Sequence, residues 1–296
     1  MSKRILILTF EFPPYRAGIG RYTAQLALGA HKFGCDVTVV APDFKQQQRK
    51  DEEDQFAYEV RRFKGTVYTA SQFPALVQRI RKLVNKESYD IIHAVDWPNC
   101  LALTLLNKFR DIPFIATIYG TEVLGVARSR QVRYLSGGKL FVTPSRLLAI
   151  SQFTKSLLLG RHPEVDADKV QVTPLGVDGS FFDPPGGPNG IRAKFNIPLE
   201  KKILLTVSRL DERKGHRVVL QSLASLPADV RSSVAYVVTG EAQNPAYLKE
   251  LRQLASGIDV PVVFAGLVSE NDLRSLYANA YLFCMPGEPN PGKVEG

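Results

Sequence analysis

Two cations follow a buried strand where an anion could be bound. The residues Ile203 to Val207 are apolar and partly β-branched, as expected of a parallel strand covered on both faces. Arg209 and Lys214 come after this strand, and they precede a helix with apolar residues at helical spacing. A strand end, two cations and a helix N-terminus can together bind a diphosphate. The alternative interpretation is a pair of solvated loop charges, and spacing alone does not decide between the two.

Two glycines follow the first predicted strand, Ile5 to Thr9. Gly18 and Gly20 are expected in a loop, with a helix from Tyr22 to about Phe33 behind them. Because glycine has no side chain, these backbone amides can approach a phosphate closely. The three-glycine fingerprint of dinucleotide-binding loops is incomplete, which argues against a nicotinamide cofactor.

Polar residues stand at two further strand ends. His93 lies near the end of a strand that starts at Tyr89, and Asp96 follows it; Tyr119 and Glu122 come after a strand over residues 114–118. Ligands of open α/β sheets bind beyond the carboxyl ends of the strands, so these positions are candidates for a substrate site. For His93, a hydrogen-bonded place inside the sheet is an equally good interpretation.

The length and composition predict two ordinary domains. The chain has 296 residues, of which 45% are hydrophobic and 23% charged. Strands and helices alternate throughout, and the Pro- and Gly-rich residues 183–190 interrupt them. We therefore expect an α/β protein with two doubly wound parallel-sheet domains, residues 1–180 and 181–296. The last predicted strand comprises residues 281–285, and no predicted helix follows to cover it. This suggests that the second domain is incomplete.

The basic residues are concentrated in the first half. Residues 1–180 contain 25 Lys and Arg against 17 Asp and Glu, a net charge of +8, whereas residues 181–296 contain 13 against 12, a net charge of +1. Such a domain suits nucleic acid, an anionic membrane surface or a phosphorylated substrate. Motifs of nucleic-acid binding are missing, so nucleic acid is not expected as a partner.

The segment from Phe73 to Lys86 predicts an amphipathic helix with basic residues on its polar face. This pattern suits contact with anionic lipid head groups, but a surface helix packed on the core is the commoner case. The sequence has no signal peptide and no run of about 18 apolar residues, which predicts a cytoplasmic protein, at most peripheral to the inner face of the membrane. Three widely spaced cysteines predict free thiols rather than disulfides.

Taken together, the motifs resemble those of retaining GT-B glycosyltransferases of family 4. No single match is specific to the family. The order and spacing of the matches along the whole chain are specific. The matching segments are Phe12–Pro14, Ala17–Gly20, Asp90–His93, Ile150–Lys155, Pro174–Asp178, Val207–Leu210 with Lys214 and Gly215, Phe264–Gly266, Tyr277–Ala280, and Pro286 leading to Val294–Gly296. The resemblance implies two Rossmann-like domains that face each other across a cleft.

The resemblance also implies roles for residues at the donor site. Arg209 and Lys214 correspond to the pair that binds the donor diphosphate and neutralises the leaving group, without a metal ion or a cofactor. Gly18, beside Gly20, corresponds to the glycine that meets the distal phosphate. Glu295 matches the first acid of the family's paired-glutamate signature, which hydrogen-bonds the donor sugar. The second acid would lie beyond Gly296, so we expect little or no activity from the chain as printed.

On the acceptor side, the candidate residues are His93, Tyr119 and Glu122, which stand at strand ends. The family usually carries a histidine where this chain has Tyr119. Tyrosine can donate a hydrogen bond but, with an ordinary pKa near 10, is a poor base at neutral pH. No general base is assigned, since the family is thought to use the leaving phosphate to take the acceptor proton.

The expected function is transfer of a sugar from a nucleotide diphosphate sugar to a hydroxyl of a glycan or glycolipid acceptor. The resemblance is strongest to bacterial enzymes of cell-envelope glycolipid and polysaccharide biosynthesis. Two alternatives remain open at this point. One is a non-catalytic nucleotide-binding fragment, and the other is an NAD-dependent oxidoreductase, since both predicted domains are Rossmann-like.

Overall fold

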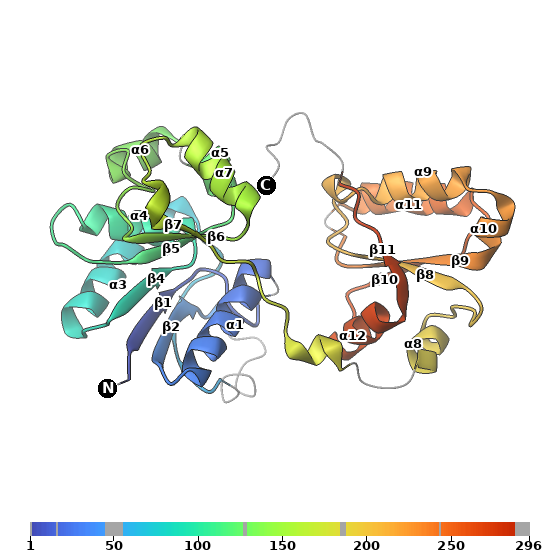
Figure 1. Cartoon of the computed structure of the whole chain (residues 1–296), viewed down its shortest axis with the longest axis horizontal. Helices are drawn as coiled ribbons and strands as arrows, with labels where there is room; N and C mark the ends of the chain where they lie inside the picture. The colour runs from blue at the N-terminus through green and yellow to red at the C-terminus, as the bar shows by residue number, and fades with distance from the viewer. Residues whose placement is uncertain are drawn as a thin grey trace. The chain divides into compact units, whose positions relative to one another are not determined.

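The computed structural model contains two compact units, Met1–Gly176 and Val177–Glu295, shown in Figure 1. It describes residues 2–15, 17–44, 56–126, 129–183, 188–242 and 244–287. The division falls slightly before the expected boundary at residue 180, so the short helix η5 (Gly179–Phe182) belongs to the second unit. The guanidinium of Arg274 donates a 3.4 Å hydrogen bond to the carbonyl of Ser180, which ties η5 to the rest of that unit.

The first unit is built on a sheet whose seven described strands are all parallel. Their order is β3-β2-β1-β4-β5-β6-β7, so the direction of winding reverses between β1 and β4. The strands are β1 (Arg4–Leu8), β2 (Asp36–Pro42), β3 (Glu59–Phe63), β4 (Ile91–Ala94), β5 (Ile115–Ile118), β6 (Arg146–Ala149) and β7 (Val170–Val172). A reversal of this kind leaves a crevice at the carboxyl ends of the two central strands, where doubly wound folds bind ligands.

Helices cover both faces of this sheet. Helix α1 packs on Ile7, Val37 and Val39, while the other helices pack on the face that carries Leu6 and Leu8. The helical elements are α1 (Gly18–Lys32), η2 (Ala70–Gln72), α3 (Phe73–Lys86), α4 (Trp97–Leu106), α5 (Thr121–Leu124), α6 (Arg130–Ser136), α7 (Gln152–Arg161) and η4 (Ala167–Lys169). The two layers follow from strand geometry, since successive side chains point to opposite faces.

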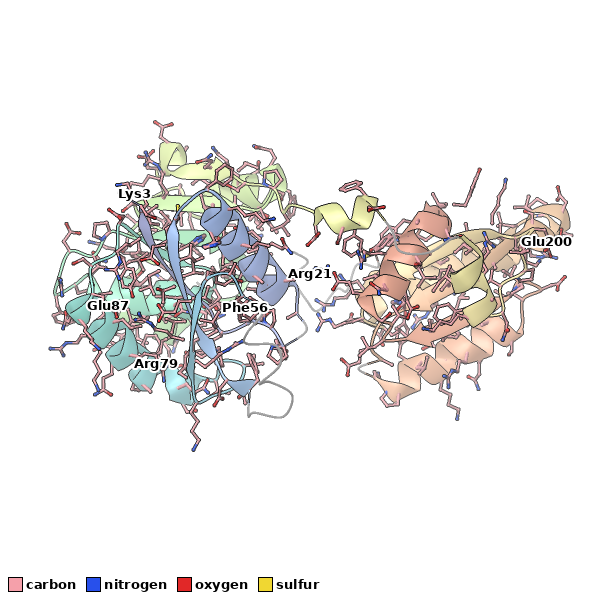
Figure 2. The ribbon with its side chains drawn as sticks, turned by 90° about the horizontal axis from the view of Figure 1, so that it is seen from below. Lys3, Arg21, Phe56, Arg79, Glu87 and Glu200 are labelled. Carbon is pink, nitrogen blue, oxygen red and sulfur yellow. The ribbon has the colours of Figure 1, made fainter. Side chains whose placement is uncertain are left out.

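Helix α3 is a packed surface helix. Its apolar side chains Phe73, Leu76 and Ile80 are buried in the core, which leaves no apolar face for insertion into a membrane. Arg79, labelled in Figure 2, lies with its guanidinium carbon 3.8 Å from the centre of the Phe63 ring. Of the two interpretations of this amphipathic segment, the structure supports the packed helix.

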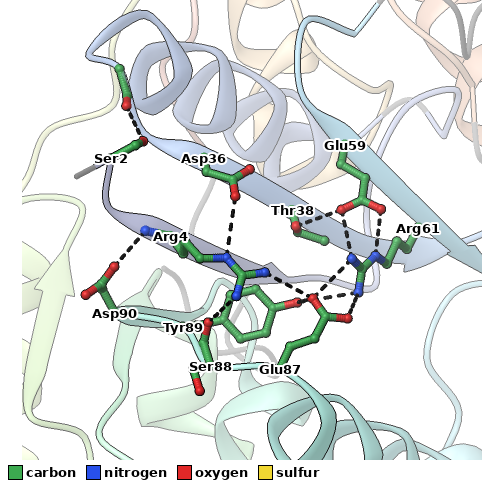
Figure 3. Close-up of polar contacts among 11 residues, drawn as sticks. Ser2, Arg4, Asp36, Thr38, Glu59, Arg61, Glu87, Ser88, Tyr89 and Asp90 are labelled. Atoms are coloured by element: carbon green, nitrogen blue, oxygen red, sulfur yellow. Dashed lines mark hydrogen bonds and ion pairs between the residues drawn. The ribbon is translucent and has the colours of Figure 1, made fainter.

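An ion-pair network joins the amino ends of the strands in the first unit (Figure 3). Arg61 on β3 contacts Glu59 at 2.8 Å and Glu87 at 2.5 Å, and Arg4 on β1 contacts Glu87 at 3.2 Å. The hydrogen bond from Arg61 to Glu87, with further ones from Tyr89 and Arg4, lowers the pKa of Glu87 to about 2. The network balances its own charges at the edge opposite the carboxyl ends, so we assign it to stability.

The second unit repeats the α/β arrangement on a smaller, wholly parallel sheet. The order of its four described strands is β10-β9-β8-β11. They are β8 (Lys202–Val207), β9 (Val234–Thr239), β10 (Val262–Gly266) and β11 (Ala280–Phe283). The helical elements after η5 are α8 (Pro188–Lys194), η6 (Glu212–Lys214), α9 (His216–Ser225), α10 (Ala228–Ser233), α11 (Pro245–Ser256) and α12 (Glu270–Asn279). Helices α9 and α11 cover one face, and α8 and α12 the other. The predicted fold class, α/β with parallel sheets in two domains, is confirmed.

The edge strand β11 is exposed on its outer side. Tyr281 is 66% and Leu282 54% exposed. Across the described ranges, none of the helices is long and apolar enough to span a bilayer.

Candidate functional site

The first candidate group lies where β1 leads into α1. Helix α1 begins at Gly18 rather than at Tyr22, so the two glycines belong to its first turn and the expected loop is corrected. The amides of a first helical turn have no partner within the helix, and Ala17, the N-cap, offers no side chain to them. A Cβ on Gly18 would meet nothing within 4 Å, whereas one on Gly20 would lie 3.1 Å from the Phe12 nitrogen. Gly18 therefore leaves space for an anion, and Gly20 allows close packing of α1 on the preceding loop.

A buried carboxylate joins this loop to the neighbouring strand. Asp96 follows β4 and caps α4, because its Oδ1 accepts hydrogen bonds from the Asn99 backbone N–H at 3.2 Å and from Asn99 Nδ2 at 2.7 Å. Its Oδ2 accepts from the Phe10 N–H at 2.5 Å. Burial raises the pKa of Asp96 to about 6. The hydrogen bonds favour the charged form and lower the pKa, but the effect of burial is larger. Asp96 thus fixes the carboxyl end of β1 relative to that of β4.

We expect Asp96→Ala to lower the free energy of unfolding of the first unit by about 2 kcal/mol, because it removes a helix cap and leaves buried N–H donors unpaired. The only tryptophan, Trp97, lies in this unit, so urea unfolding followed by tryptophan fluorescence measures the effect. Asp111→Ala, at an exposed site in the same unit, is the matched control. A change no larger than that of the control would contradict the structural role of Asp96.

His93 is inside the sheet. It is 3% exposed on β4, and its Nε2 lies 2.8 Å from Thr117 Oγ1 on β5. Thr117 is also hydrogen-bonded to the Tyr22 side chain from α1. Burial lowers the pKa of His93 to about 4, so the imidazole is neutral at pH 7. The structure therefore places His93 in a sheet-stabilising network rather than at an open surface.

Tyr119 and Glu122 form the turn that follows β5. The Glu122 carboxylate is buried and accepts hydrogen bonds from the Tyr119 N–H at 2.5 Å and from Thr121 Oγ1 at 3.2 Å. The Tyr119 hydroxyl is buried and has no hydrogen-bond partner within the part of the chain that the structure describes. Its ring packs edge-on against Tyr22, with the ring centres 6.1 Å apart. Burial raises the pKa of Tyr119, so the hydroxyl stays protonated and can donate a hydrogen bond to a ligand.

The second candidate group is the cationic turn between β8 and α9. Its three cations are Arg209, Arg213 and Lys214. Arg213 is bound by Asp211, with Nε to Oδ1 and Nη2 to Oδ2 both at 3.0 Å. These contacts lower the pKa of Asp211 to about 2. Within the described ranges, neither the exposed Arg209 nor the half-buried Lys214 has a side-chain hydrogen bond or ion pair. Two cations thus remain available to an external anion.

Two glycines shape this turn. Gly215 is the N-cap of α9 with a φ of 71°, and a Cβ there would lie 2.7 Å from Pro286 Cγ. Gly240 follows β9 with a φ of 142°, and its Cβ would lie 1.9 Å from the Ser208 carbonyl oxygen. Only glycine permits this close approach beside Arg209. Lys214 directly precedes the amides of the first turn of α9, a combination that favours phosphate binding.

The predicted site residues therefore fall into separate groups. One group lies at the carboxyl edge of the first sheet and comprises His93, Tyr119, Glu122, Gly18 and Gly20. The other group lies at the carboxyl edge of the second sheet and comprises Arg209 and Lys214. Glu295 lies outside the described residues. A cavity of about 420 Å³ elsewhere on the first unit includes none of them; its lining includes Arg133, Arg161, His162 and Glu164.

Three residues of these groups were not predicted from the sequence: Thr117, Tyr22 and Gly240. Gly240 had a usable signal, because a glycine directly after a buried parallel strand often marks a close backbone approach. Thr117 and Tyr22 had none, since their contacts with His93 and Tyr119 join different elements.

Two family models match the chain, one on each unit. The model described as "Glycosyltransferase Family 4" matches residues 16–181, and "Glycosyl transferases group 1" matches residues 189–292. A GDP-mannose-dependent alpha-(1-6)-phosphatidylinositol monomannoside mannosyltransferase of Mycobacterium tuberculosis is 29% identical, over 96% of this chain and 72% of the relative. A D-inositol 3-phosphate glycosyltransferase of Xylanimonas cellulosilytica is 26% identical, over 72% of this chain and 54% of the relative.

Solved structures agree on the fold. HepE of Anabaena in complex with UDP and glucose superposes with a TM-score of 0.74 at 19% identity, covering 98% of this chain and 76% of HepE. WaaG, a glycosyltransferase of lipopolysaccharide biosynthesis, superposes with a TM-score of 0.67 at 17% identity, covering 96% and 75% of the two chains. At these identities the likeness shows a shared GT-B architecture and does not identify a substrate.

Proposed function

The chain belongs to glycosyltransferase family 4 and has the GT-B fold, and from this premise we propose that it transfers a sugar from a nucleoside diphosphate sugar to a hydroxyl of a glycolipid acceptor. The family assignment makes it a glycosyltransferase and favours this function over an NAD-dependent oxidoreductase. A nucleotide-sugar donor agrees with the relatives and with the UDP-bound structural neighbour.

One observation carries the proposal. In the turn after β8, Asp211 forms an ion pair with Arg213, while the Arg209 and Lys214 side chains have no hydrogen bond or ion pair with a described residue. Cations without an ion-pair partner are available to an external anion, and a diphosphate supplies two negative groups for charge-assisted hydrogen bonds. The amides at the start of α9, next to Lys214, add further donors.

The proposed reaction breaks the bond between the anomeric carbon of the sugar and the diphosphate oxygen. A bond forms between the same carbon and the acceptor oxygen, with retention of configuration. The acceptor proton passes to the departing phosphate, which accumulates negative charge as the sugar leaves. Arg209 and Lys214 would stabilise this charge, a task that a divalent metal ion performs in other transferases.

The acceptor proposal rests on the relatives. The mycobacterial relative is named for transfer to a phosphatidylinositol monomannoside, and WaaG is named for lipopolysaccharide biosynthesis. Residues 1–180, which include the whole first unit, have a net charge of +8 and suit an acceptor that carries phosphate. On this side the Tyr119 hydroxyl has no described hydrogen-bond partner that it would have to give up to a ligand.

Calorimetric titration with GDP, UDP and NAD tests the donor class. We expect one nucleoside diphosphate to bind at least about tenfold more tightly than NAD, because the site has cations for a terminal diphosphate. Incubation with GDP-mannose or UDP-glucose and phosphatidylinositol mannoside then tests transfer, with and without EDTA. Equal or tighter NAD binding would contradict the donor assignment, and sugar transfer to the acceptor would exclude the non-catalytic alternative. Activity that EDTA abolishes would contradict the metal-free proposal.

A further inference from the structure

Two aromatic side chains protrude from the basic first unit. Phe109 lies just after α4 and is 83% exposed, and Tyr134 lies on α6 and is 84% exposed. Scattered exposed apolar residues are normal, so each side chain alone would need no explanation. Two large aromatics on adjoining segments among unpaired cations form a surface of defined chemistry.

The segments that carry these aromatics are in contact. Lys108 Nζ donates a hydrogen bond to the Tyr134 carbonyl oxygen at 3.5 Å, which links the end of α4 to α6. Lys108 Nζ would also lie 3.5 Å from a Cβ on Gly137, at the end of α6. We call the residues Lys108, Phe109, Arg110, Arg133 and Tyr134 the α4–α6 surface.

The cations of the α4–α6 surface are not held in ion pairs within the described part of the chain. None of Lys108, Arg110 and Arg133 forms an ion pair with a described residue. The guanidinium of Arg110 instead donates to the neutral side chain of Asn85, in the last turn of α3. An acidic residue, Asp111, follows Arg110 in sequence and is exposed, so it offsets one of these charges.

The contact with Asn85 extends the positive surface onto α3. Arg81, Lys82 and Lys86 are exposed on that helix. Glu87, which ends it, is already bound by Arg61 and Arg4 and does not offset their charge. Figure 2 labels Glu87 beside α3. Because the apolar face of α3 is buried, it can add charge to a binding surface but no apolar anchor.

We propose that the α4–α6 surface binds anionic lipid bilayers, with Phe109 and Tyr134 entering the interfacial region and the cations meeting lipid phosphates. Aromatic rings combined with Lys and Arg suit the boundary between head groups and acyl chains. Each cation near an anionic membrane contributes about 1 kcal/mol. The positive charge of the surface is complementary to an anionic membrane. The two exposed rings add apolar contacts, which a purely electrostatic partner would not require.

Vesicle flotation tests this inference without requiring glycosyl transfer. The whole chain is mixed with vesicles of phosphatidylglycerol and phosphatidylcholine, or of phosphatidylcholine alone, and the bound fraction is measured at rising salt. We expect binding to the anionic vesicles that weakens as salt rises. Two double variants should each reduce the binding constant at least about tenfold. One combines Phe109→Ser with Tyr134→Ser, and the other combines Lys108→Gln with Arg110→Gln.

Phe33→Ser is the matched control. Phe33 is 91% exposed at the end of α1, the helix on the opposite face of the sheet, so its loss should leave vesicle binding unchanged. Circular dichroism verifies that each variant is folded. The inference is overturned if the unmodified chain does not bind anionic vesicles. It is also overturned if Phe33→Ser loses as much vesicle binding as the aromatic double variant, or if the aromatic double variant keeps its binding. A glycosyltransferase whose donor assay succeeds but which ignores vesicles would refute only this inference.

Discussion

Replacing both Arg209 and Lys214 with alanine should weaken binding of a nucleoside diphosphate by about 10³-fold. Hydrogen bonds between charged groups contribute about 1.5–3 kcal/mol each, so removing two of them costs several kcal/mol of binding free energy. The fold should tolerate the change, because neither side chain has a hydrogen bond or ion pair with a described residue to lose. Isothermal titration calorimetry with GDP and UDP measures the loss.

Two single variants separate site-specific loss from a general change in charge. Lys249 is an exposed cation on α11 of the same unit, so Lys249→Ala should leave the affinity within about twofold. Arg213→Ala removes the cation that Asp211 already binds, and we expect a much smaller loss of affinity than in the double variant. If the double variant binds diphosphate as well as Lys249→Ala does, the turn after β8 is not the donor site.

Much of the architecture follows from local patterns in the sequence. Helix α3 spans Phe73–Lys86 as predicted, because its apolar residues repeat at helical spacing and an N-terminal proline is compatible with a first turn. Helix α1 begins earlier than predicted, at Gly18. Glycine has low helix propensity, yet tertiary packing decided the start: Gly20 is pressed against the backbone at Phe12, where a side chain would not fit.

The candidate site was predictable only where its residues are neighbours in sequence. Arg209 and Lys214 stand in one turn, and the strand before them marks its position. The pairing that makes Arg213 unavailable is also local, through Asp211, but sequence alone did not show which cation would be paired. The contact between His93 and Thr117 depends on the register of β4 against β5, which no single segment encodes.

Gly240→Ala should lower the free energy of unfolding of the second unit by about 3 kcal/mol or more. The φ of 142° is strained for any residue with a side chain, and the new methyl group would lie 1.9 Å from the Ser208 carbonyl oxygen. Relief requires movement of the segment that leads from β8 into Arg209, so diphosphate affinity should fall as well. Urea unfolding followed by far-UV circular dichroism measures stability across both units, whereas fluorescence of Trp97 follows the first unit.

Two other glycines of the same unit separate the clash from backbone strain. Gly266 has a φ of 65° but open space around its Cβ position, so Gly266→Ala should cost about 1 kcal/mol from strain alone. Gly257 has a φ of −90° and its Cβ would lie 3.5 Å from Leu254 O, so Gly257→Ala should be nearly neutral. The order of destabilisation should be Gly240, then Gly266, then Gly257. If Gly240→Ala is no worse than Gly266→Ala, the backbone at Ser208 yields easily, and the close approach does not hold Arg209 in place.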